Sequence, residues 1–136
     1  MATQGTPFSG RDDIASLAYI SGQLTLVAYT NTPNSLGNST VAADLTQPTS
    51  ANGYAPILLD GVWSSVNGVL TYLHSAGANY FSGNPGWQAS GGWSGVVTGL
   101  ALIRGSACRH FRDLDSAFTA ANLKKLVANL SEIIGG

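Results

Sequence analysis

Apolar residues are concentrated in one long stretch, residues 91–103, and this concentration predicts a buried strand. Glycines flank Trp93, and the residues from Val96 onward are mostly β-branched or aliphatic. The two faces of this strand would consist of Val97, Gly99, Ala101 and Ile103 and of Val96, Thr98, Leu100 and Leu102. Because both faces are nearly apolar, we expect the strand either to be central in a sandwich with cover on both sides or to be covered on one side by another subunit.

Two hairpins are predicted from turn signals between β-prone runs. The turn Arg104-Gly105-Ser106 joins the long strand to a second run, Ala107 to Leu114. Asn67-Gly68 lies between Val62–Val66 and Val69–Leu73, and this dipeptide favours a two-residue type I′ turn. Both pairs are therefore expected to be antiparallel.

Further strands are predicted on either side of a long polar loop, residues 31–39. Gln23 to Thr30 precedes the loop, and Tyr54 to Leu59 follows it. Pro56 lacks a backbone donor, which places the second strand at a sheet edge or a strand start. Shorter extended segments are predicted at Val41 to Leu45 and at Ala78 to Phe81, and a turn is predicted at Gly83 to Gly86.

The two ends of the chain carry helical patterns. Asp12 to Gly22 begins with acidic residues and ends at a glycine, which predicts a short amphipathic helix after a flexible arm, Met1 to Gly10. The apolar residues of 123–134 also have helical spacing, and a strand fits them less well. The pattern as a whole predicts a mainly β, antiparallel fold with a short N-terminal helix. Residues 1–10 form the arm and residues 11–136 one β-rich domain.

Charged residues make up only 10% of the chain, against about 25% in an average soluble domain. Ser, Thr, Asn and Gly supply most of the polar positions. Such a surface suits burial by partners or packing of many copies at high density, and it also fits an ordinary β-rich protein. With a formal net charge of −1, the chain gives no electrostatic case for binding nucleic acid or an anionic membrane.

Cysteine content and hydropathy indicate the cellular compartment in which we expect this protein to fold. Cys108 is the only cysteine, so no disulfide can form within the chain. The N-terminal residues lack the pattern of a secretory signal, and no run approaches the roughly 18 apolar residues of a transmembrane helix. We therefore expect a soluble protein that folds in a reducing cytosol.

Candidates for metal binding and nucleophilic catalysis are few. Cys108 and His110 alternate onto one strand face, but two ligands make no stable zinc site and His74 is remote in sequence. Ser94 sits in a segment that matches the Gly-x-Ser-x-Gly elbow only until its fifth residue, which is Val96. We expect these side chains to be structural, and the chain to hold no metal or cofactor.

Asp113 and Asp115 are the closest carboxylates beyond the N-terminal segment and could be imagined as an acid and base pair. Arg109 and Arg112 lie nearby, so ion pairing at the end of a strand is the favoured role. These arginines make the hairpin modestly basic, but without an organised aromatic platform they do not predict nucleic-acid binding. The sequence therefore predicts no catalytic residue and no enzyme.

Three tryptophans, Trp63, Trp87 and Trp93, allow two interpretations. They could stack on sugars, as in a carbohydrate-binding module. The favoured interpretation is that they anchor the core and an interface of a glycine-rich sheet. The candidate interface residues are Phe8, Trp63, Tyr80, Phe81, Trp87 and Trp93.

The order of several short motifs extends from about Asp12 to Gly136. These motifs are Tyr29-Thr30-Asn31, Ala43-Asp44-Leu45-Thr46, Gly53-Tyr54-Ala55, the hairpin Val62 to Leu73, the strand Trp93 to Arg104, and a closing part with His110-Phe111 and Lys124 to Ile134. In this order the chain resembles a family of small β-rich virion proteins of tailed bacteriophages. The resemblance implies a β-sandwich or barrel in which Leu126 to Ile133 is the last strand. The chain departs from the family by an insertion, Ser75 to Gln88, and by Cys108.

Within such a family, the doubly apolar strand, the low charge and the free arm favour a capsid decoration, or cement, protein that is made in the host cytoplasm and binds the outer surface of the head. Its partners would be the major capsid protein and further copies of itself, with a trimer favoured. Met1 to Gly10 and Ser75 to Gln88 are the candidate contact segments. The alternative within the virion is a tail, baseplate or fibre-tip component that acts in host adsorption. An enzyme acting on cell-wall polymers would need a pair of carboxylates lining a cleft.

Overall fold

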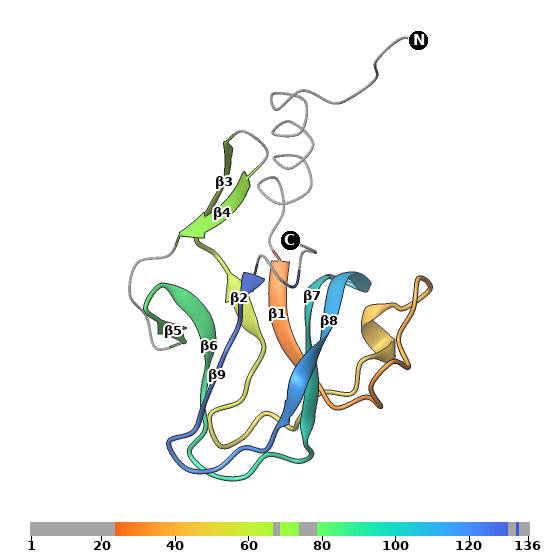
Figure 1. Ribbon diagram of the computed structural model, residues 1–136, viewed down its shortest axis with the longest axis vertical. Coiled ribbons are helices and arrows are strands. Elements are labelled where there is room, and N and C mark those ends of the chain that lie inside the picture. Colours follow the sequence, from red (N-terminus) through yellow and green to blue (C-terminus); the bar gives the residue numbers. More distant parts are fainter. Residues whose placement is uncertain (1–23, 67–68, 74–78, 131–132, 134–136) are drawn as a thin grey trace.

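The computed structural model describes residues 24–66, 69–73, 79–130 and 133 (Figure 1). The expected helix at Asp12 to Gly22 and the expected arm at Met1 to Gly10 lie outside these residues. In the described part of the chain, no helix is long and apolar enough to cross a membrane. The elements are β1 (Leu24–Tyr29), a 3-10 helix η2 (Ala42–Asp44), β2 (Ile57–Leu59), β3 (Val62–Val66), β4 (Val69–Leu73), β5 (Tyr80–Phe81), β6 (Asn84–Gln88), β7 (Val97–Arg104), β8 (Ala107–Phe118) and β9 (Lys125–Val127).

The larger sheet has the strand order β2-β1-β7-β8, and every neighbouring pair in it is antiparallel. Its central strand β7 is the long apolar run of the sequence, and it pairs with β1 on one side and with β8 on the other. The predicted hairpin around Gly105 is confirmed by the pairing of Arg104 with Ala107. Pro56 directly precedes β2, and β2 lies at the edge of the sheet, as predicted from the backbone donor that proline lacks.

The smaller sheet has the order β5-β6-β9, and the two sheets pack against each other as a sandwich (Figure 1). The core between them is apolar throughout, and Trp87, Leu24, Leu26 and Leu102 are completely buried in it. The expectation of a mainly β, sandwich-like fold is therefore confirmed, while its N-terminal helix lies outside the described residues.

The two apolar faces of β7 are both covered by the chain itself. Leu100 and Leu102 belong to the main core, whereas Ala101 packs with Val27 and Tyr29 in a second, smaller cluster. Leu45, just after η2, closes this second cluster from the outside of the sheet. Of the two arrangements that the sequence left open, cover on both sides within one chain is the one observed.

The β3–β4 hairpin is a two-stranded sheet of its own that extends away from the sandwich (Figure 1). Val66 pairs with Val69, so the strands are joined by two residues as the Asn67-Gly68 dipeptide predicts. Trp63 is opposite Tyr72 in the register of the hairpin.

The predicted turn at Gly83 to Gly86 is wrong, because Asn84 to Gln88 form strand β6. The turn lies one step earlier, where Ser82 and Gly83 both have positive φ angles, of 53° and 83°. Gly86 serves another purpose: a Cβ there would overlap the backbone of Leu126, so the glycine lets β9 approach β6 closely.

The final strand is much shorter than the resemblance implies. β9 ends at Val127, and helical structure begins at Leu130, with the Ile133 N–H donating to the Asn129 carbonyl at 3.2 Å. The strand predicted over Leu126 to Ile133 is therefore wrong beyond Val127, and helical spacing describes only the residues after it.

The extended segment predicted at Val41 to Leu45 is likewise shorter than expected. Val41 forms an isolated bridge with Ala107, and η2 follows at once. The Asp44 carboxylate accepts a hydrogen bond from the Val41 N–H at 2.9 Å, which stabilises the first turn of this 3-10 helix.

Candidate functional site

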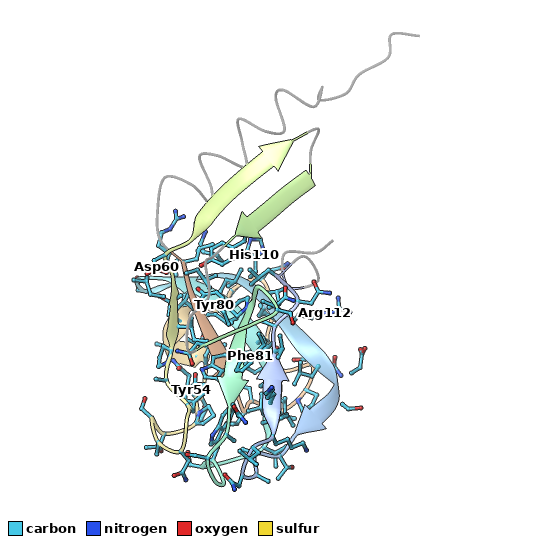
Figure 2. All side chains as sticks on the ribbon, turned by 90° about the vertical axis from the view of Figure 1, so that its left-hand side faces the viewer. Tyr54, Asp60, Tyr80, Phe81, His110 and Arg112 are labelled. Atoms are coloured by element: carbon cyan, nitrogen blue, oxygen red, sulfur yellow. The ribbon has the colours of Figure 1, made fainter. Side chains whose placement is uncertain are left out.

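Five of the six candidate interface residues lie in the part of the chain that the structure describes, and they lie in two places. Phe8 lies outside the described residues, and Trp63 is placed by its backbone only, in β3. Tyr80 and Phe81 form β5, close to the root of the hairpin, and both are half-buried (Figure 2). Trp87 and Trp93 lie together elsewhere, with ring centroids 6.3 Å apart.

Trp87 and Trp93 are held in an aromatic cluster with Tyr54. Trp87 is 0% exposed and donates its indole N–H to the Ala55 carbonyl at 2.7 Å. Trp93 donates to the Asn52 carbonyl at 2.9 Å, and its ring lies 5.1 Å from that of Tyr54. Because Trp87 has no exposed surface, it is unavailable to a partner or a sugar and acts as a core residue.

The hairpin is tied to the sandwich through two tyrosines. The Tyr72 hydroxyl accepts a hydrogen bond from the Gly61 N–H at 2.9 Å and shares another with the Tyr80 hydroxyl at 2.8 Å. The two rings are stacked, with centroids 6.3 Å apart. Phe81, next to Tyr80, has the Lys125 ammonium 5.1 Å from its ring centroid, within range of a cation–π interaction.

These contacts define a hairpin root, made of Tyr72, Tyr80 and Phe81, with the backbone of Trp63 beside it in the register of the hairpin. Three of the six candidates thus belong to one region, and the register of β3 with β4 places Trp63 there, opposite Tyr72. Tyr72 itself is missing from the residues predicted from sequence. Its position in the register, directly across from a tryptophan in an antiparallel hairpin, is the signal that could have found it.

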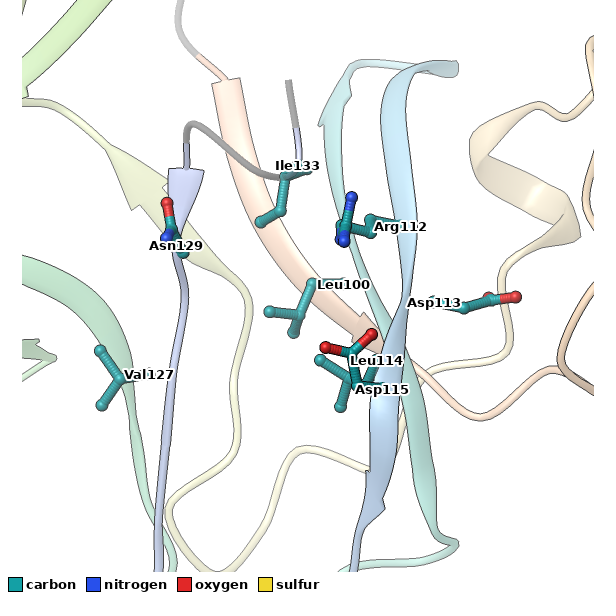
Figure 3. A pocket seen from close by; sticks show the side chains of 8 residues that line it. All are labelled: Leu100, Arg112, Asp113, Leu114, Asp115, Val127, Asn129 and Ile133. Carbon is teal, nitrogen blue, oxygen red and sulfur yellow. The ribbon is translucent and has the colours of Figure 1, made fainter. Parts of the chain in front are cut away.

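A small cavity of about 130 Å³ opens between β8 and the segment that follows β9 (Figure 3). Its walls are apolar, and Arg112, Asp115 and Asn129 provide polar groups around it. Arg112 and Asp115 lie on the cavity side of β8, whereas the Asp113 carboxylate points away on the other side (Figure 3). The two aspartates are therefore not an acid and base pair, since their carboxylates lie on opposite sides of the strand.

Asp113 anchors the polar loop to the large sheet. Its carboxylate accepts a hydrogen bond from the Tyr29 hydroxyl at 2.7 Å and one from the Asn34 N–H at 2.8 Å. Arg112 lies on the other side of β8 (Figure 3), so Asp113 is held by a hydroxyl and a backbone amide. Burial, followed by the hydrogen bond to Asp113, raises the pKa of Tyr29 far above its usual range.

Replacing Asp113 by Ala removes both acceptors and leaves the buried Tyr29 hydroxyl without its partner. We expect the free energy of unfolding to fall by about 2 kcal/mol, since hydrogen bonds to a charged group are the stronger kind. Denaturant titration measures this loss, and hydrogen exchange of the Asn34 amide reports release of the loop. Asp115→Ala is the control, because that side chain is exposed; equal losses in the two variants would contradict the anchoring role.

Cys108 and His110 do not share a face, contrary to the prediction. Leu102 pairs with His110 and Ile103 with Cys108, so Arg109 is an extra residue in a β-bulge that reverses the alternation. Burial raises the pKa of the Cys108 thiol and, with Arg109 as a second cause, lowers the pKa of His110. Among the described residues no group of three or more His, Cys, Asp or Glu side chains is placed to hold a metal.

Ser94 links two loops. Its hydroxyl accepts a hydrogen bond from the Thr49 N–H at 2.6 Å and lies 3.0 Å from the Thr49 hydroxyl. The residue thus joins the approach to β7 to the loop before β2, which is a structural role.

Buried tyrosines predict loss of stability in alkali. Burial raises the pKa of Tyr54 from 10.0 to about 12. It also raises the pKa values of Tyr29 and Tyr80, which are hydrogen-bonded to Asp113 and Tyr72. The folded state therefore favours neutral phenols. Their contribution to the free energy of unfolding is complete below the pKa of an unfolded tyrosine, and it declines as the pH rises through the pKa values of the folded state.

We accordingly expect the unfolding midpoint to fall by about 5 °C or more when the pH rises from neutral to about 11. Thermal unfolding followed by circular dichroism, with phenolate absorbance recorded alongside, measures both quantities. If all the phenolates form near the pKa of an unfolded tyrosine and the protein loses no stability, these tyrosines do not have the raised pKa values assigned to them.

The geometry of this chain offers a hairpin root and a small cavity. No family model, curated protein or solved structure matches the chain.

Proposed function

We propose that this chain is a decoration protein of a tailed bacteriophage, which binds the outer surface of the head and stabilises contacts between major capsid subunits. The observation that carries the proposal is the β3–β4 hairpin. From Val62 to Leu73 it contains no charged residue, and it stands as a separate two-stranded sheet beside the sandwich. A two-stranded hairpin is marginally stable by itself in water, so an uncharged one of this kind is suited to lie against another surface.

The composition supports a role in a dense assembly. Only 10% of the residues are charged, so neighbouring copies would repel one another little. The exposed loop at residues 32–39 consists of small polar residues, Pro33 and Gly37, and one half-buried leucine, Leu36. The motif order that resembles phage virion proteins is a second, independent support.

The hairpin root supplies the rigidity that such a contact needs. Tyr72 is fixed by Gly61 and Tyr80, so the hairpin is held to the sandwich at its base. A preformed arm binds without the entropy cost of ordering a free segment. Many copies bound to one shell would then multiply a modest contact into lasting reinforcement.

The proposal is tested by the copy number and position of the chain in purified particles. Quantitative protein analysis is expected to give a number that matches the icosahedral symmetry of the head, and an image reconstruction to show density on the outer shell. A low number confined to the tail would contradict the decoration role and would assign the chain to host adsorption instead.

A charge placed in the hairpin tests the contact directly. Ser65→Asp introduces a carboxylate opposite Leu70, and we expect it to lower the affinity for empty capsids by about tenfold or more because that charge would be buried on binding. Ser39→Asp puts the same charge in an exposed loop and serves as the control. If both variants bind like the unmodified protein, the hairpin is not the contact.

A further inference from the structure

The cavity of about 130 Å³ beside β8 has apolar walls that continue into the core of the sandwich (Figure 3). Leu100 and Ile133 belong to the main core cluster, and Leu114 packs against that cluster. Val127, which comes from β9, is a further wall residue and is 40% exposed. The cavity therefore has core residues as its inner walls and an outer wall that is exposed to solvent.

An irregularity in β8 decides which charged side chains face this cavity. The register of β8 against β7 shifts between Asp113 and Phe118. Unbroken alternation would put Asp115 on the same face as Asp113 and opposite to Arg112. In the structure Asp115 lies on the cavity side together with Arg112, and the Asp113 carboxylate points away (Figure 3). The irregular strand thus directs an anion to the side that already holds a cation, as bulged strands commonly do beside functional sites.

Arg112 and Asp115 are both exposed and carry opposite charges. Among the described residues, neither side chain forms a hydrogen bond or an ion pair. They are three positions apart in the sequence, so their Cα atoms are at most about 11 Å apart. A small ligand that carries an anionic and a cationic group close together can therefore reach both side chains at once.

We propose that this cavity binds a free α-amino acid with an aliphatic side chain, such as leucine. The carboxylate of the ligand pairs with Arg112, whose guanidinium offers two parallel N–H donors to a carboxylate. The ammonium group donates to Asp115, and the side chain enters the cavity against Leu100, Leu114 and Ile133. This binding is separate from the proposed capsid contact, which uses the β3–β4 hairpin.

The volume and the two charges together define the ligand class. An apolar protein cavity of about 150 Å³ holds one benzene molecule, so this one has room for a side chain of about five carbon atoms. The isobutyl group of leucine fits, and the larger benzyl group of phenylalanine does not. An amine would satisfy Asp115 alone and a fatty acid Arg112 alone, whereas a zwitterion satisfies both. Three contacts to the groups of one tetrahedral carbon also distinguish the two enantiomers of the ligand.

Titration of the full chain with L-leucine and with D-leucine, followed by NMR spectra of the backbone amides, tests the proposal. One enantiomer is expected to bind at least about fivefold more tightly than the other, because only one can place all three groups at once. Its saturable shifts are expected at the amides of Arg112 to Asp115 and of Val127. Isopentylamine, which lacks the carboxylate, and isocaproate, which lacks the ammonium group, are each expected to bind at least about fivefold more weakly than the preferred enantiomer.

Two variants test the charges of the chain itself. Arg112→Gln and Asp115→Asn each remove one charge at an exposed position, so both are expected to fold, and each is expected to weaken the binding of leucine at least about fivefold. The control is Arg109→Gln, which removes an exposed charge from the same strand at a residue that does not line this cavity. That variant is expected to bind leucine like the unmodified chain.

Three results would overturn the proposal. The first is the absence of saturable binding of either enantiomer up to about 20 mM, well above the millimolar constants of weak specific complexes. The second is equal binding of the two enantiomers. The third is equal binding by Arg112→Gln, Asp115→Asn and the Arg109→Gln control, since leucine would then be held by other groups.

Discussion

Replacing Gly99 by Ala is expected to cost about 3 kcal/mol or more of unfolding free energy, enough to unfold a domain of ordinary stability. A Cβ at this position would overlap the ring of Tyr29, which crosses β7 from the neighbouring strand to reach Asp113. Neither side can yield, because the Tyr29 ring is completely buried and its hydroxyl is bonded. Urea titration of the purified variant measures the loss.

The matched control is Gly92→Ala, because a Cβ there meets no atom within 4 Å. We expect that variant to unfold within about 0.5 kcal/mol of the original chain, as surface substitutions usually do. The double variant Gly99→Ala with Tyr29→Leu should recover part of the lost stability, since the smaller side chain vacates the space. If Gly99→Ala is as stable as Gly92→Ala, the packing of Tyr29 over the glycine is incorrect.

Replacing Trp87 by Ala is expected to lower the unfolding free energy by about 4 kcal/mol, the range for deleting a buried large aromatic side chain. Trp87 is completely buried, packs against Tyr54 and Trp93, and satisfies the Ala55 carbonyl. The loss combines a cavity with an unpaired carbonyl oxygen. Denaturant unfolding followed by the fluorescence of the remaining tryptophans measures it.

Trp87→Phe is the companion variant, because it keeps most of the apolar volume and removes only the indole donor. Its expected loss is about 2 kcal/mol, from the unpaired Ala55 carbonyl and the smaller ring. If the Trp87→Ala protein is fully stable but fails to bind glycans, the core role of Trp87 is contradicted. The residue would then act in the recognition of sugars.

Local signals predicted the hairpins of this fold well. The Asn67-Gly68 dipeptide and the turn at Gly105 each specify a connection through a few neighbouring residues, so no distant contact is needed to interpret them. β6 was missed because Pro85 and Gly86 are typical of turns. Their place in a strand depends on β9, whose backbone approaches Gly86 closely and lies far away in sequence.

The candidate site was predictable only in part, for a related reason. Aromatic residue types correctly drew attention to Tyr80 and Phe81, but nothing local distinguishes the buried Trp87 from a surface tryptophan. The separation of Cys108 from His110 depends on a single bulged residue, which changes every face assignment after it. Strand periodicity assumes unbroken alternation and therefore fails at such a point.

The pairing of β1 with β7 also sets the order in which this protein can be assembled during translation. Leu26 in β1 pairs with Leu102 in β7, and Gly86 in β6 pairs with Val127 in β9. Neither pair can form before the later strand has been synthesised. The emerging chain therefore holds β1 without β7, and β6 without β9, until these later strands have been synthesised. Such long-range sheets close slowly, and an incomplete chain exposes the edges that the finished one pairs. Ribosome-bound fragments that stop before β7 should be readily digested by protease, and resistance should appear only after β9 has left the exit tunnel.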